Sequence, residues 1–278
     1  MSSPLSPPLS TPHLDVTGGV FVITGGTQGL GLSTARLLKG NGAAGLVLVS
    51  RTERKQACIE LDGDGCHCLW IQADLSNQED ASSVIPKAVE AMKDVGPITG
   101  VVNAAATTAR GNLTTTTAED FDLQMALNVR APFLITQAAA KHMKGGSIVN
   151  IASSAAHGGA PFIMAYSVSK AALVALTKNN AAELAPRRIR VNAINMGWTY
   201  TDNEDAVQQD EHAAGSNWLQ HADASVPLGR INRPQDVAAT ICFLLSGASA
   251  MMTGSVIDLH SDYPHGMLSC SPTAGEGR

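Results

Sequence analysis

Residues 20–31 read VFVITGGTQGLG and join a short apolar run to a glycine-rich turn. The run at 20–23 has the length and composition of a strand that is buried on both faces. Behind the turn, apolar residues recur at helical spacing as far as Leu38. Glycines between a strand and a helix bring the backbone close to a diphosphate, which then lies at the positive end of the helix. The stretch predicts a dinucleotide-binding turn, with an ordinary strand-to-helix turn as the alternative.

Six further apolar runs follow at intervals that leave room for crossover helices. They cover residues 46–49, 69–73, 98–102, 147–151, 189–194 and 255–259. Such alternation predicts an α/β fold: a doubly wound parallel sheet of about seven strands with helices on both faces. Ligands of such sheets bind beyond the carboxyl ends of the strands.

Composition limits the classes of function. The net charge of −5 gives no electrostatic reason to expect nucleic acid or a membrane surface as a partner. Five cysteines at irregular spacing predict no disulfide framework and favour a reducing, cytoplasmic compartment. Cys66-His67-Cys68 is a weak metal motif, because alternate residues of a strand point to opposite faces. No metal site is expected.

A chain of 278 residues suits one α/β domain. Residues 1–18 contain four prolines and four serines and are expected to form a disordered leader, without the pattern of a signal peptide. We expect a single domain at 19–262 and a flexible tail at 263–278. No apolar run approaches the roughly 20 residues that span a bilayer.

Tyr166 and Lys170 are four residues apart, so a helix would place both on one face. A nearby ammonium favours the phenolate, which moves the tyrosine pKa toward neutral pH and lets the phenol exchange a proton. Ser153 and Ser154 close the apolar run at 147–151, so that a strand end could supply a hydroxyl to this phenol. The spacing alone also occurs by chance on many helices.

Together the motifs resemble the short-chain dehydrogenase/reductase family over roughly residues 19–259. The turn TGGTQGLG resembles the family's TGxxxGxG loop. Asp74-Leu75 resembles the pair that holds the adenine, and residues 195–201 resemble the segment that binds the nicotinamide carboxamide. The resemblance implies a Rossmann-type fold and a nicotinamide cofactor. The cofactor-binding residues expected from it and from the strand ends are Gly25, Thr27, Gln28, Gly29, Leu30, Gly31, Ser50, Arg51, Asp74, Leu75, Asn103, Ala104, Tyr166, Lys170, Gly197, Thr199 and Thr201.

The resemblance also implies four catalytic residues: Asn128, Ser154, Tyr166 and Lys170. Tyr166 would exchange a proton with the substrate oxygen, Lys170 would lower the tyrosine pKa and bind the nicotinamide ribose, and Asn128 would hold a relay water. Ser154 would donate a hydrogen bond to the reacting oxygen. It is preferred to Ser153, although its interval to Tyr166 is one residue shorter than the commonest form.

Three positions depart from the family pattern. The chain reads Asn103-Ala104-Ala105-Ala106 where Asn-Asn-Ala-Gly is usual, so the loop loses glycine flexibility. Met196 replaces a proline before Gly197, and His260-Ser261-Asp262 stands where an aspartate followed by glycines is common. None of these changes removes a catalytic group.

Nucleotide preference is predicted from the end of the second strand, Ser50-Arg51. An NAD enzyme commonly carries an acid there, whereas a 2′-phosphate requires a cation. Arg51 and the Ser50 hydroxyl therefore favour NADP(H), with NAD(H) as the alternative.

Residues 200–226 form a polar insertion, here called the lid. A polar lid favours a hydroxylated substrate such as a sugar or polyol, or a small cyclic alcohol or ketone, over a steroid or a long acyl chain. The residues expected to contact the alcohol or carbonyl substrate are Ser154, His157, Phe162, Trp198 and Trp218.

The segments 120–141 and 163–184 are expected to form long, alanine-rich helices, and in the family these pair across two-fold axes. A homodimer or homotetramer is therefore expected, with a monomer as the alternative. Two other functions compatible with the fold are a dinucleotide-binding regulator or scaffold without turnover, and an epimerase or dehydratase.

Overall fold

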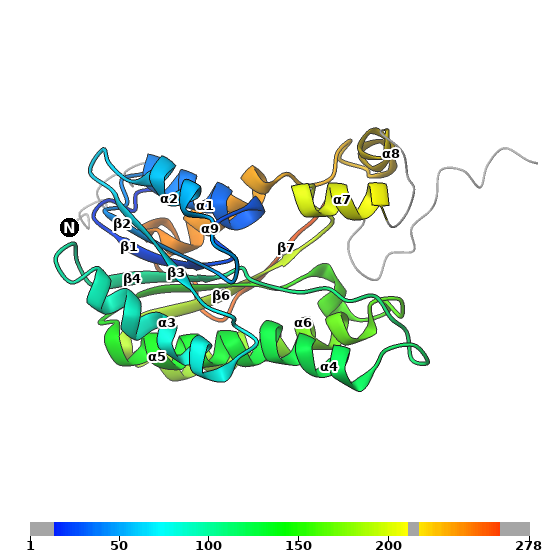
Figure 1. The fold of residues 1–278 in the computed structure, drawn as a ribbon, viewed down its shortest axis with the longest axis horizontal. Coiled ribbons are helices and arrows are strands. Elements are labelled where there is room, and N and C mark those ends of the chain that lie inside the picture. Colours follow the sequence, from blue (N-terminus) through cyan, green and yellow to red (C-terminus); the bar gives the residue numbers. More distant parts are fainter. Residues whose placement is uncertain (1–13, 211–216, 262–278) are drawn as a thin grey trace, which may run out of the picture.

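The computed structural model describes residues 14–210 and 217–261 (Figure 1). Its centre is one parallel sheet with the strand order β3-β2-β1-β4-β5-β6-β7, which confirms the predicted doubly wound architecture. The strands, in chain order, are β1 (Val20–Thr24), β2 (Gly45–Ser50), β3 (His67–Gln72), β4 (Ile98–Asn103), β5 (Gly146–Ile151), β6 (Ile189–Met196) and β7 (Val256–Leu259).

Helices fill the crossovers between these strands. They are α1 (Gly29–Gly40), α2 (Lys55–Leu61), α3 (Gln78–Ala91), α4 (Ala118–Met125), α5 (Ala131–His142), α6 (Met164–Leu184), α7 (Asp202–Asp210), α8 (Trp218–Ser225) and α9 (Pro234–Leu245). Shorter turns are η1 (Ala126–Arg130), η2 (Ser154–His157), η3 (Ala185–Arg187) and η4 (Gly247–Ser249).

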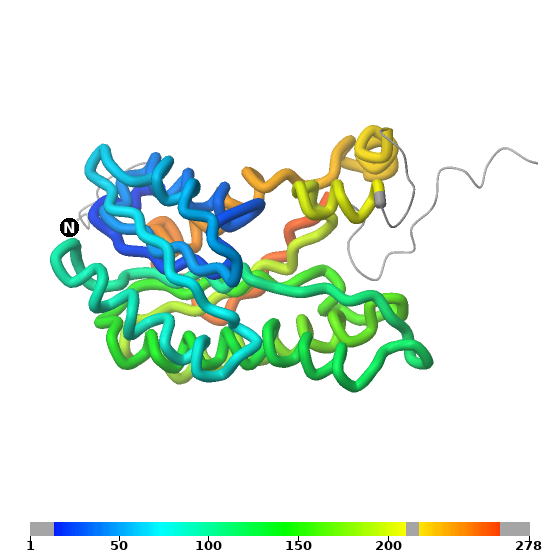
Figure 2. Tube along the Cα trace, in the orientation of Figure 1, coloured from blue at the N-terminus to red at the C-terminus, as the bar shows by residue number. Residues whose placement is uncertain are grey.

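Two apolar cores flank the sheet. On one face, buried residues of α3, α5 and α6 pack on the strands, and on the other face those of α1, α2 and α9 do so. The helices α1 and α9 come from opposite ends of the sequence yet share one layer, blue beside orange in Figure 2. Because both faces are covered, the strands can be apolar throughout, as the sequence indicates.

Some helix ends are fixed by local capping. The Asn77 side chain accepts hydrogen bonds from the backbone N–H groups of Glu79 and Asp80 at the start of α3, and Thr117 accepts one from Asp120 at the start of α4. These bonds satisfy N–H groups that have no partner inside the helix.

The expected helix over 120–141 is not continuous. Between α4 and α5 the chain makes a π-helical turn, η1, which is wider than an α-helical turn and joins the two helices directly. Such turns occur frequently at functional sites. This one carries Asn128, which is buried.

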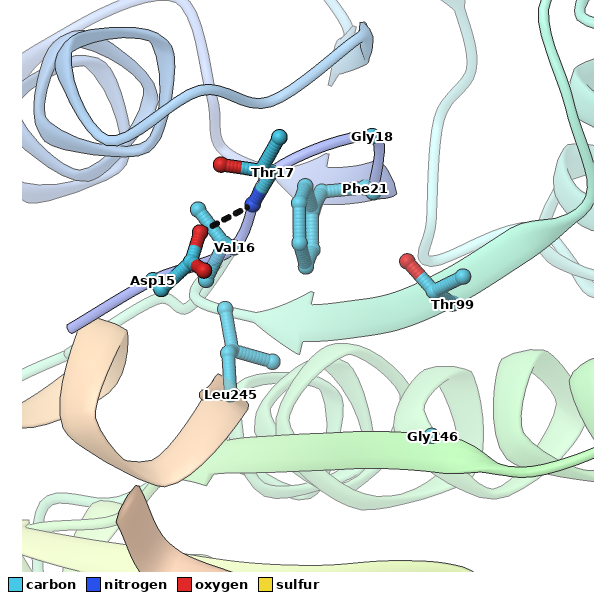
Figure 3. Close-up of a pocket in the computed structure, with 9 residues that line it drawn as sticks. Asp15, Val16, Thr17, Gly18, Phe21, Thr99, Gly146 and Leu245 are labelled. Carbon is cyan, nitrogen blue, oxygen red and sulfur yellow. Dashed lines mark hydrogen bonds between the residues drawn. The ribbon is translucent and has the colours of Figure 1, made fainter. Parts of the chain in front are cut away.

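The structure also shortens the expected leader. Val16 is buried, and its N–H donates to the carbonyl of Asn41, so the ordered domain includes residues before Gly19. The remaining leader residues, 1–13, and the tail residues from 262 lie outside the described residues. Near Val16 a pocket of about 280 Å³ opens beside the amino ends of β1 and β4 (Figure 3), opposite the edge where such sheets bind ligands.

Candidate active site

The glycine turn between β1 and α1 is shaped for close backbone contact. Gly25 has a φ of +66°, which favours glycine, and a Cβ on Gly31 would lie 2.2 Å from the carbonyl oxygen of Gly25. Gln28 caps α1 without a side-chain hydrogen bond, so N–H groups at this helix end are open to an anion. The turn therefore fits the diphosphate of a dinucleotide.

Neighbouring strand ends are tied to this turn. The Thr24 hydroxyl accepts hydrogen bonds of 3.0 Å from the N–H groups of Ala104 and Ala105. Thr27 is buried, Leu30 packs against the core, and Gln28 is exposed. Ala104 and Ala105 thus hold this loop against the end of β1.

A chain of buried polar side chains runs from β4 to α6. Asn103 Nδ2 donates to Asn150 Oδ1 (2.8 Å), Asn150 Nδ2 donates to Thr177 Oγ1 (2.9 Å), and Thr177 donates to the carbonyl of Leu173. Within the described residues, Asn103 Oδ1 is buried without a hydrogen-bond partner. A buried acceptor of this kind is costly unless a partner completes it, so Asn103 fits a role in holding a ligand.

The end of β2 is supported by β3. Trp70 Nε1 donates to the Ser50 hydroxyl (2.8 Å), and Gln72 Nε2 donates to the Arg51 carbonyl (3.0 Å). The Ser50 hydroxyl in turn donates to the Thr52 carbonyl. Within the described part of the chain the Arg51 guanidinium makes no hydrogen bond, and Arg51 is exposed.

Asp74 follows β3 at the same edge. Its carboxylate accepts hydrogen bonds from the Ser76 hydroxyl and N–H, and these bonds, together with the charge of Arg51, lower the pKa of Asp74. Leu75 is buried in the core. Asp74 therefore carries a negative charge beside Arg51 at neutral pH.

Tyr166 and Lys170 lie in the first two turns of α6. The Lys170 side chain is 2% exposed, its Nζ donates to the Ile151 carbonyl at 2.7 Å, and Nζ lies 5.5 Å from the centre of the Tyr166 ring. Burial lowers the pKa of Lys170 to about 7. Burial also raises the pKa of Tyr166, so in this state the phenol keeps its proton at neutral pH.

The serine next to this phenol is Ser153 and not the expected Ser154. Ser153 is hydrogen-bonded to the Tyr166 hydroxyl, which partly opposes the effect of burial on the tyrosine pKa. Ser153 still has extended backbone dihedrals after β5, whereas Ser154 opens the 3-10 turn η2. The change of direction between the two residues decides which hydroxyl meets the phenol, so Ser153 joins Ser154 as a candidate for the role of the site serine.

Thr108 supplies a second hydroxyl beside the Tyr166 phenol, and no sequence pattern pointed to this residue. Its side chain also hydrogen-bonds the phenol. Thr108 lies in the irregular segment after β4, where the six alanines and threonines of residues 104–109 carry no spacing signal. A hydroxyl just beyond the end of a parallel strand is the only hint that the sequence offers.

Asn128 connects the loop before Thr108 to α6. Its Oδ1 accepts from the Thr107 N–H, and its Nδ2 donates both to the Thr107 carbonyl and to the Ser169 hydroxyl, each at 3.0 Å. Ser169 donates in turn to the Tyr166 carbonyl. Asn128 therefore lies close to the tyrosine, and in this state its amide binds protein groups on both sides.

The segment after β6 reaches back to the glycine turn. Gly29, with a φ of +48°, would place a Cβ 3.8 Å from the Thr201 methyl group. The Thr199 hydroxyl donates to the Gly197 carbonyl, and Thr201 caps α7 through the Glu204 N–H. The residues expected to grip the cofactor thus converge from β1 and β6.

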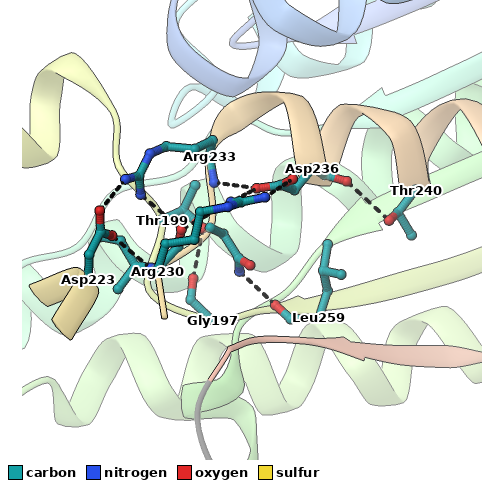
Figure 4. Close-up of polar contacts among 10 residues, drawn as sticks. Gly197, Thr199, Asp223, Arg230, Arg233, Asp236, Thr240 and Leu259 are labelled. Atoms are coloured by element: carbon teal, nitrogen blue, oxygen red, sulfur yellow. Dashed lines mark hydrogen bonds and ion pairs between the residues drawn. The ribbon is translucent and has the colours of Figure 1, made fainter. Parts of the chain in front are cut away.

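The lid consists of α7 and α8 in the described residues and is held at its base by ion pairs (Figure 4). Arg233 pairs with Asp223 of α8 at 2.6 Å, and Arg230 pairs with Asp236 of α9. Arg233 also lies over the Tyr200 ring. These contacts fix α8 to the start of α9.

Two tryptophans anchor the lid from inside. Trp218, which is 4% exposed, donates from Nε1 to Asp205 and packs on Trp198 and Tyr200 at 6.0 Å between ring centres. Trp198 donates to Glu204 and is 43% exposed. Trp218 is therefore part of the lid's own core, and only Trp198 of this pair presents much surface.

His157 and Phe162 lie between Ser153 and Tyr166. His157 Nε2 is 2.8 Å from Asp258 Oδ1, a carboxylate oxygen that also accepts from Asn195 Nδ2. Phe162 is exposed, with the Arg110 guanidinium 6.0 Å from its ring centre. The assignment of these residues and of the tryptophans to substrate contacts stays a prediction.

The described residues contain neither a metal-binding cluster nor a membrane-spanning helix. Residues 14–210 and 217–261 contain no group of three or more histidine, cysteine, aspartate or glutamate side chains that could hold a metal ion. Among the helices of the same residues, none has the length and apolar character needed to cross a membrane.

A phenol beside a buried ammonium, at the edge where a Rossmann-type sheet binds dinucleotides, defines the class of dinucleotide-dependent oxidoreductases. A family model described as enoyl-(acyl carrier protein) reductase matches residues 25–261. The chain is 32% identical over 243 residues to the human dehydrogenase/reductase SDR family member 4, covering 86% of this chain and 84% of that protein. The chain belongs to the short-chain dehydrogenase/reductase family and is an NAD(P)-dependent oxidoreductase of that family.

Solved structures agree with this membership. A short chain dehydrogenase from Burkholderia cenocepacia J2315 in complex with NADP superposes with a TM-score of 0.79 at 28% identity, covering 89% of this chain and 98% of that one. An NAD⁺-bound xylitol dehydrogenase gives a TM-score of 0.79 at 27% identity, covering 88% and 98%. The two neighbours thus bind different nicotinamide nucleotides.

Proposed function

We propose that the protein interconverts an alcohol and a carbonyl compound with NADP(H), using Tyr166 as the general acid and base. The observation that carries this proposal is the Tyr166 hydroxyl, which has a serine hydroxyl and a buried lysine beside it at the carboxyl edge of the sheet. When bound, the nicotinamide supplies or accepts the hydride. The glycine turn, Asn103 and the segment 197–201 are the parts of the chain that would hold it.

Each residue of the site has a distinct task in this proposal. Tyr166 gives its proton to the substrate oxygen during reduction and takes one from the alcohol during oxidation. Ser153 donates a hydrogen bond to the same oxygen while charge develops on it, the task first expected for Ser154. Lys170 favours the phenolate by its positive charge, and Asn128 keeps the loop at 107–108 and α6 in their relative positions.

The direct test is turnover. The purified protein is mixed with NADPH or NADH and a panel of carbonyl compounds, and with the oxidised nucleotides and a panel of sugars, polyols and cyclic alcohols, while absorbance at 340 nm is followed. Turnover that needs both nucleotide and substrate supports the proposal. Nucleotide binding without turnover on any substrate would favour a binding role for the fold.

Nucleotide preference is proposed from Arg51. Arg51 directly follows β2, is exposed, and makes no side-chain hydrogen bond within the described residues, and its charge lowers the pKa of Asp74. A cation with free donors at this position suits a 2′-phosphate, which can accept a forked pair of hydrogen bonds. One of the two solved neighbours above was crystallised with NADP, which agrees with this choice without deciding it.

Arg51→Asp is expected to weaken NADPH binding at least tenfold more than NADH binding. A lost charged hydrogen bond is worth about 1.5–3 kcal/mol, and the new carboxylate adds repulsion of the phosphate. Fluorescence titration with each nucleotide measures the effect. Lys87→Asp, the same charge change at an exposed position of α3, is the control. Equal losses for both nucleotides would show that Arg51 does not read the phosphate.

We also propose a homodimer or homotetramer built on α4, α5 and α6. These helices expose Phe121, Leu123, Phe133 and Val168, which are 38–45% exposed. Light scattering after size exclusion should give two or four times 28.8 kDa, and Phe133→Glu should lower this mass. Leu113→Glu, at an exposed residue outside these helices, should not. A mass near 28.8 kDa for the unaltered chain would reject the proposal.

We propose a cytoplasmic location. The free thiols of Cys58, Cys66, Cys68 and Cys242 in the described residues support a reducing compartment.

A further inference from the structure

Three cysteines gather between α2 and β3, away from the catalytic residues. Cys58 lies on α2, Cys68 on β3, and Cys66 just before β3, and all three are buried free thiols. They belong to the apolar core on the face covered by α1, α2 and α9. No metal-binding role is expected for them from their spacing, and the proposed reaction does not use them.

Cys58 and Cys68 are in direct contact. A hydrogen bond between the two thiols joins Cys58 on α2 to Cys68 on β3, and both residues line the same pocket. The hydrogen bond between them lowers the pKa of the Cys58 thiol. The same hydrogen bond, together with burial, raises the pKa of the Cys68 thiol. Cys58 is therefore the better nucleophile of the pair, because the thiolate is the reactive form.

A pocket leads to both sulfurs. Cys58, Cys68, Lys55 and Trp70 line a cavity of about 430 Å³ that is open to the surface. Both cysteines are 6–7% exposed, so a small oxidant can reach them while a protein cannot. Cys66 and Cys242 are buried and do not belong to the wall of this pocket.

We propose that Cys58 and Cys68 form a reversible disulfide when the protein meets a peroxide. The Cys58 thiolate attacks one oxygen of hydrogen peroxide and the O–O bond breaks, which gives a sulfenic acid; the leaving hydroxide takes up the proton that the Cys58 thiol lost on ionising and becomes one water. The Cys68 sulfur then attacks the Cys58 sulfur, an S–S bond replaces the S–O bond, and the leaving hydroxide takes the Cys68 proton as the second water. Two thiols lose two electrons, and a dithiol reductant reverses the change.

The site is next to the residues that shape the end of β2. Cys68, Trp70 and Gln72 alternate along β3 and so project on the same face of the strand. Trp70 and Gln72 are the residues that hydrogen-bond Ser50 and Arg51. A covalent link between α2 and β3 would thus involve the same strand that hydrogen-bonds Ser50 and Arg51, the two residues proposed to select the nucleotide.

Peptide mapping tests the proposal. The full chain is treated with hydrogen peroxide, remaining thiols are blocked, and the protein is cut after glutamates. Cleavage after Glu53, Glu60 and Glu79 puts Cys58 on one peptide and Cys66 with Cys68 on the next. We expect these two peptides to be joined, with the mass of two hydrogen atoms lost, and to separate after dithiothreitol.

Variants identify the partner of Cys58. Cys58→Ser and Cys68→Ser should abolish the joined peptides, while Cys66→Ser and Cys242→Ser should leave them unchanged. A link within the peptide that holds Cys66 and Cys68, a link to Cys270, or oxidation of Cys58 beyond sulfenic acid with no link would overturn the proposal. Because the mapping is done first on the unaltered chain, it does not depend on whether a variant folds.

Discussion

Replacing Tyr166 with phenylalanine should lower kcat by about 10²–10⁴-fold in either direction of the reaction, the usual contribution of a positioned acid or base. The change removes the hydroxyl that is hydrogen-bonded to Ser153 and Thr108 and leaves the ring in place beside Lys170. Nucleotide affinity should change little, since the glycine turn is untouched. Steady-state kinetics and fluorescence titration measure the two quantities separately.

A Tyr166→Phe enzyme with near-normal kcat would reject Tyr166 as the acid and base. Thr108→Val is a useful companion, because it removes the other hydroxyl on the phenol while keeping a branched side chain. A loss smaller than that of Tyr166→Phe would place Thr108 as a residue that positions the phenol.

Ser153→Ala should lower kcat by about 10²–10³-fold, the cost of removing one donor from a developing oxyanion. Ser154→Ala is its matched control: the adjacent residue, the same deletion and the same strand end. The structure predicts a large loss for the first and a loss within about twofold for the second. Kinetics of the two variants at saturating nucleotide give the comparison.

A larger loss of kcat for Ser154→Ala than for Ser153→Ala would identify Ser154 as the serine of the site. Equal, moderate losses would mean that the strand end as a whole was disturbed, and circular dichroism of both variants would show whether this is so.

The architecture was predictable from the sequence because its signals are local. Each strand is a short apolar run, the glycines at 25, 29 and 31 stand between a strand and a helix, and parallel order follows from the crossover lengths. Tyr166 and Lys170 could be paired for the same reason, since helical spacing fixes their common face.

The site residues that sequence reasoning missed depend on where the backbone turns. Ser153 and Ser154 differ only in which side of a strand-to-turn junction they occupy, and no pattern of side chains encodes that position. Thr108 lies in an irregular loop whose course is set by Asn128 from a distant helix. The π turn that carries Asn128 has no signature in composition either, so the sequence predicted one continuous helix.

The buried amide pair of Asn103 and Asn150 has a consequence for how β4 and β5 find their alignment. Both strands are apolar on two faces, so sliding one along the other would still bury apolar side chains, and hydrophobicity discriminates poorly between alignments. The two asparagines stand opposite each other only in the native pairing. A slip of two residues would break this bond and leave Asn103 Nδ2 and Asn150 Oδ1 buried without their partner, at a cost of about 1–3 kcal/mol for each group. The asparagine pair, of which Asn103 belongs to the proposed cofactor site, therefore disfavours misaligned sheets during folding.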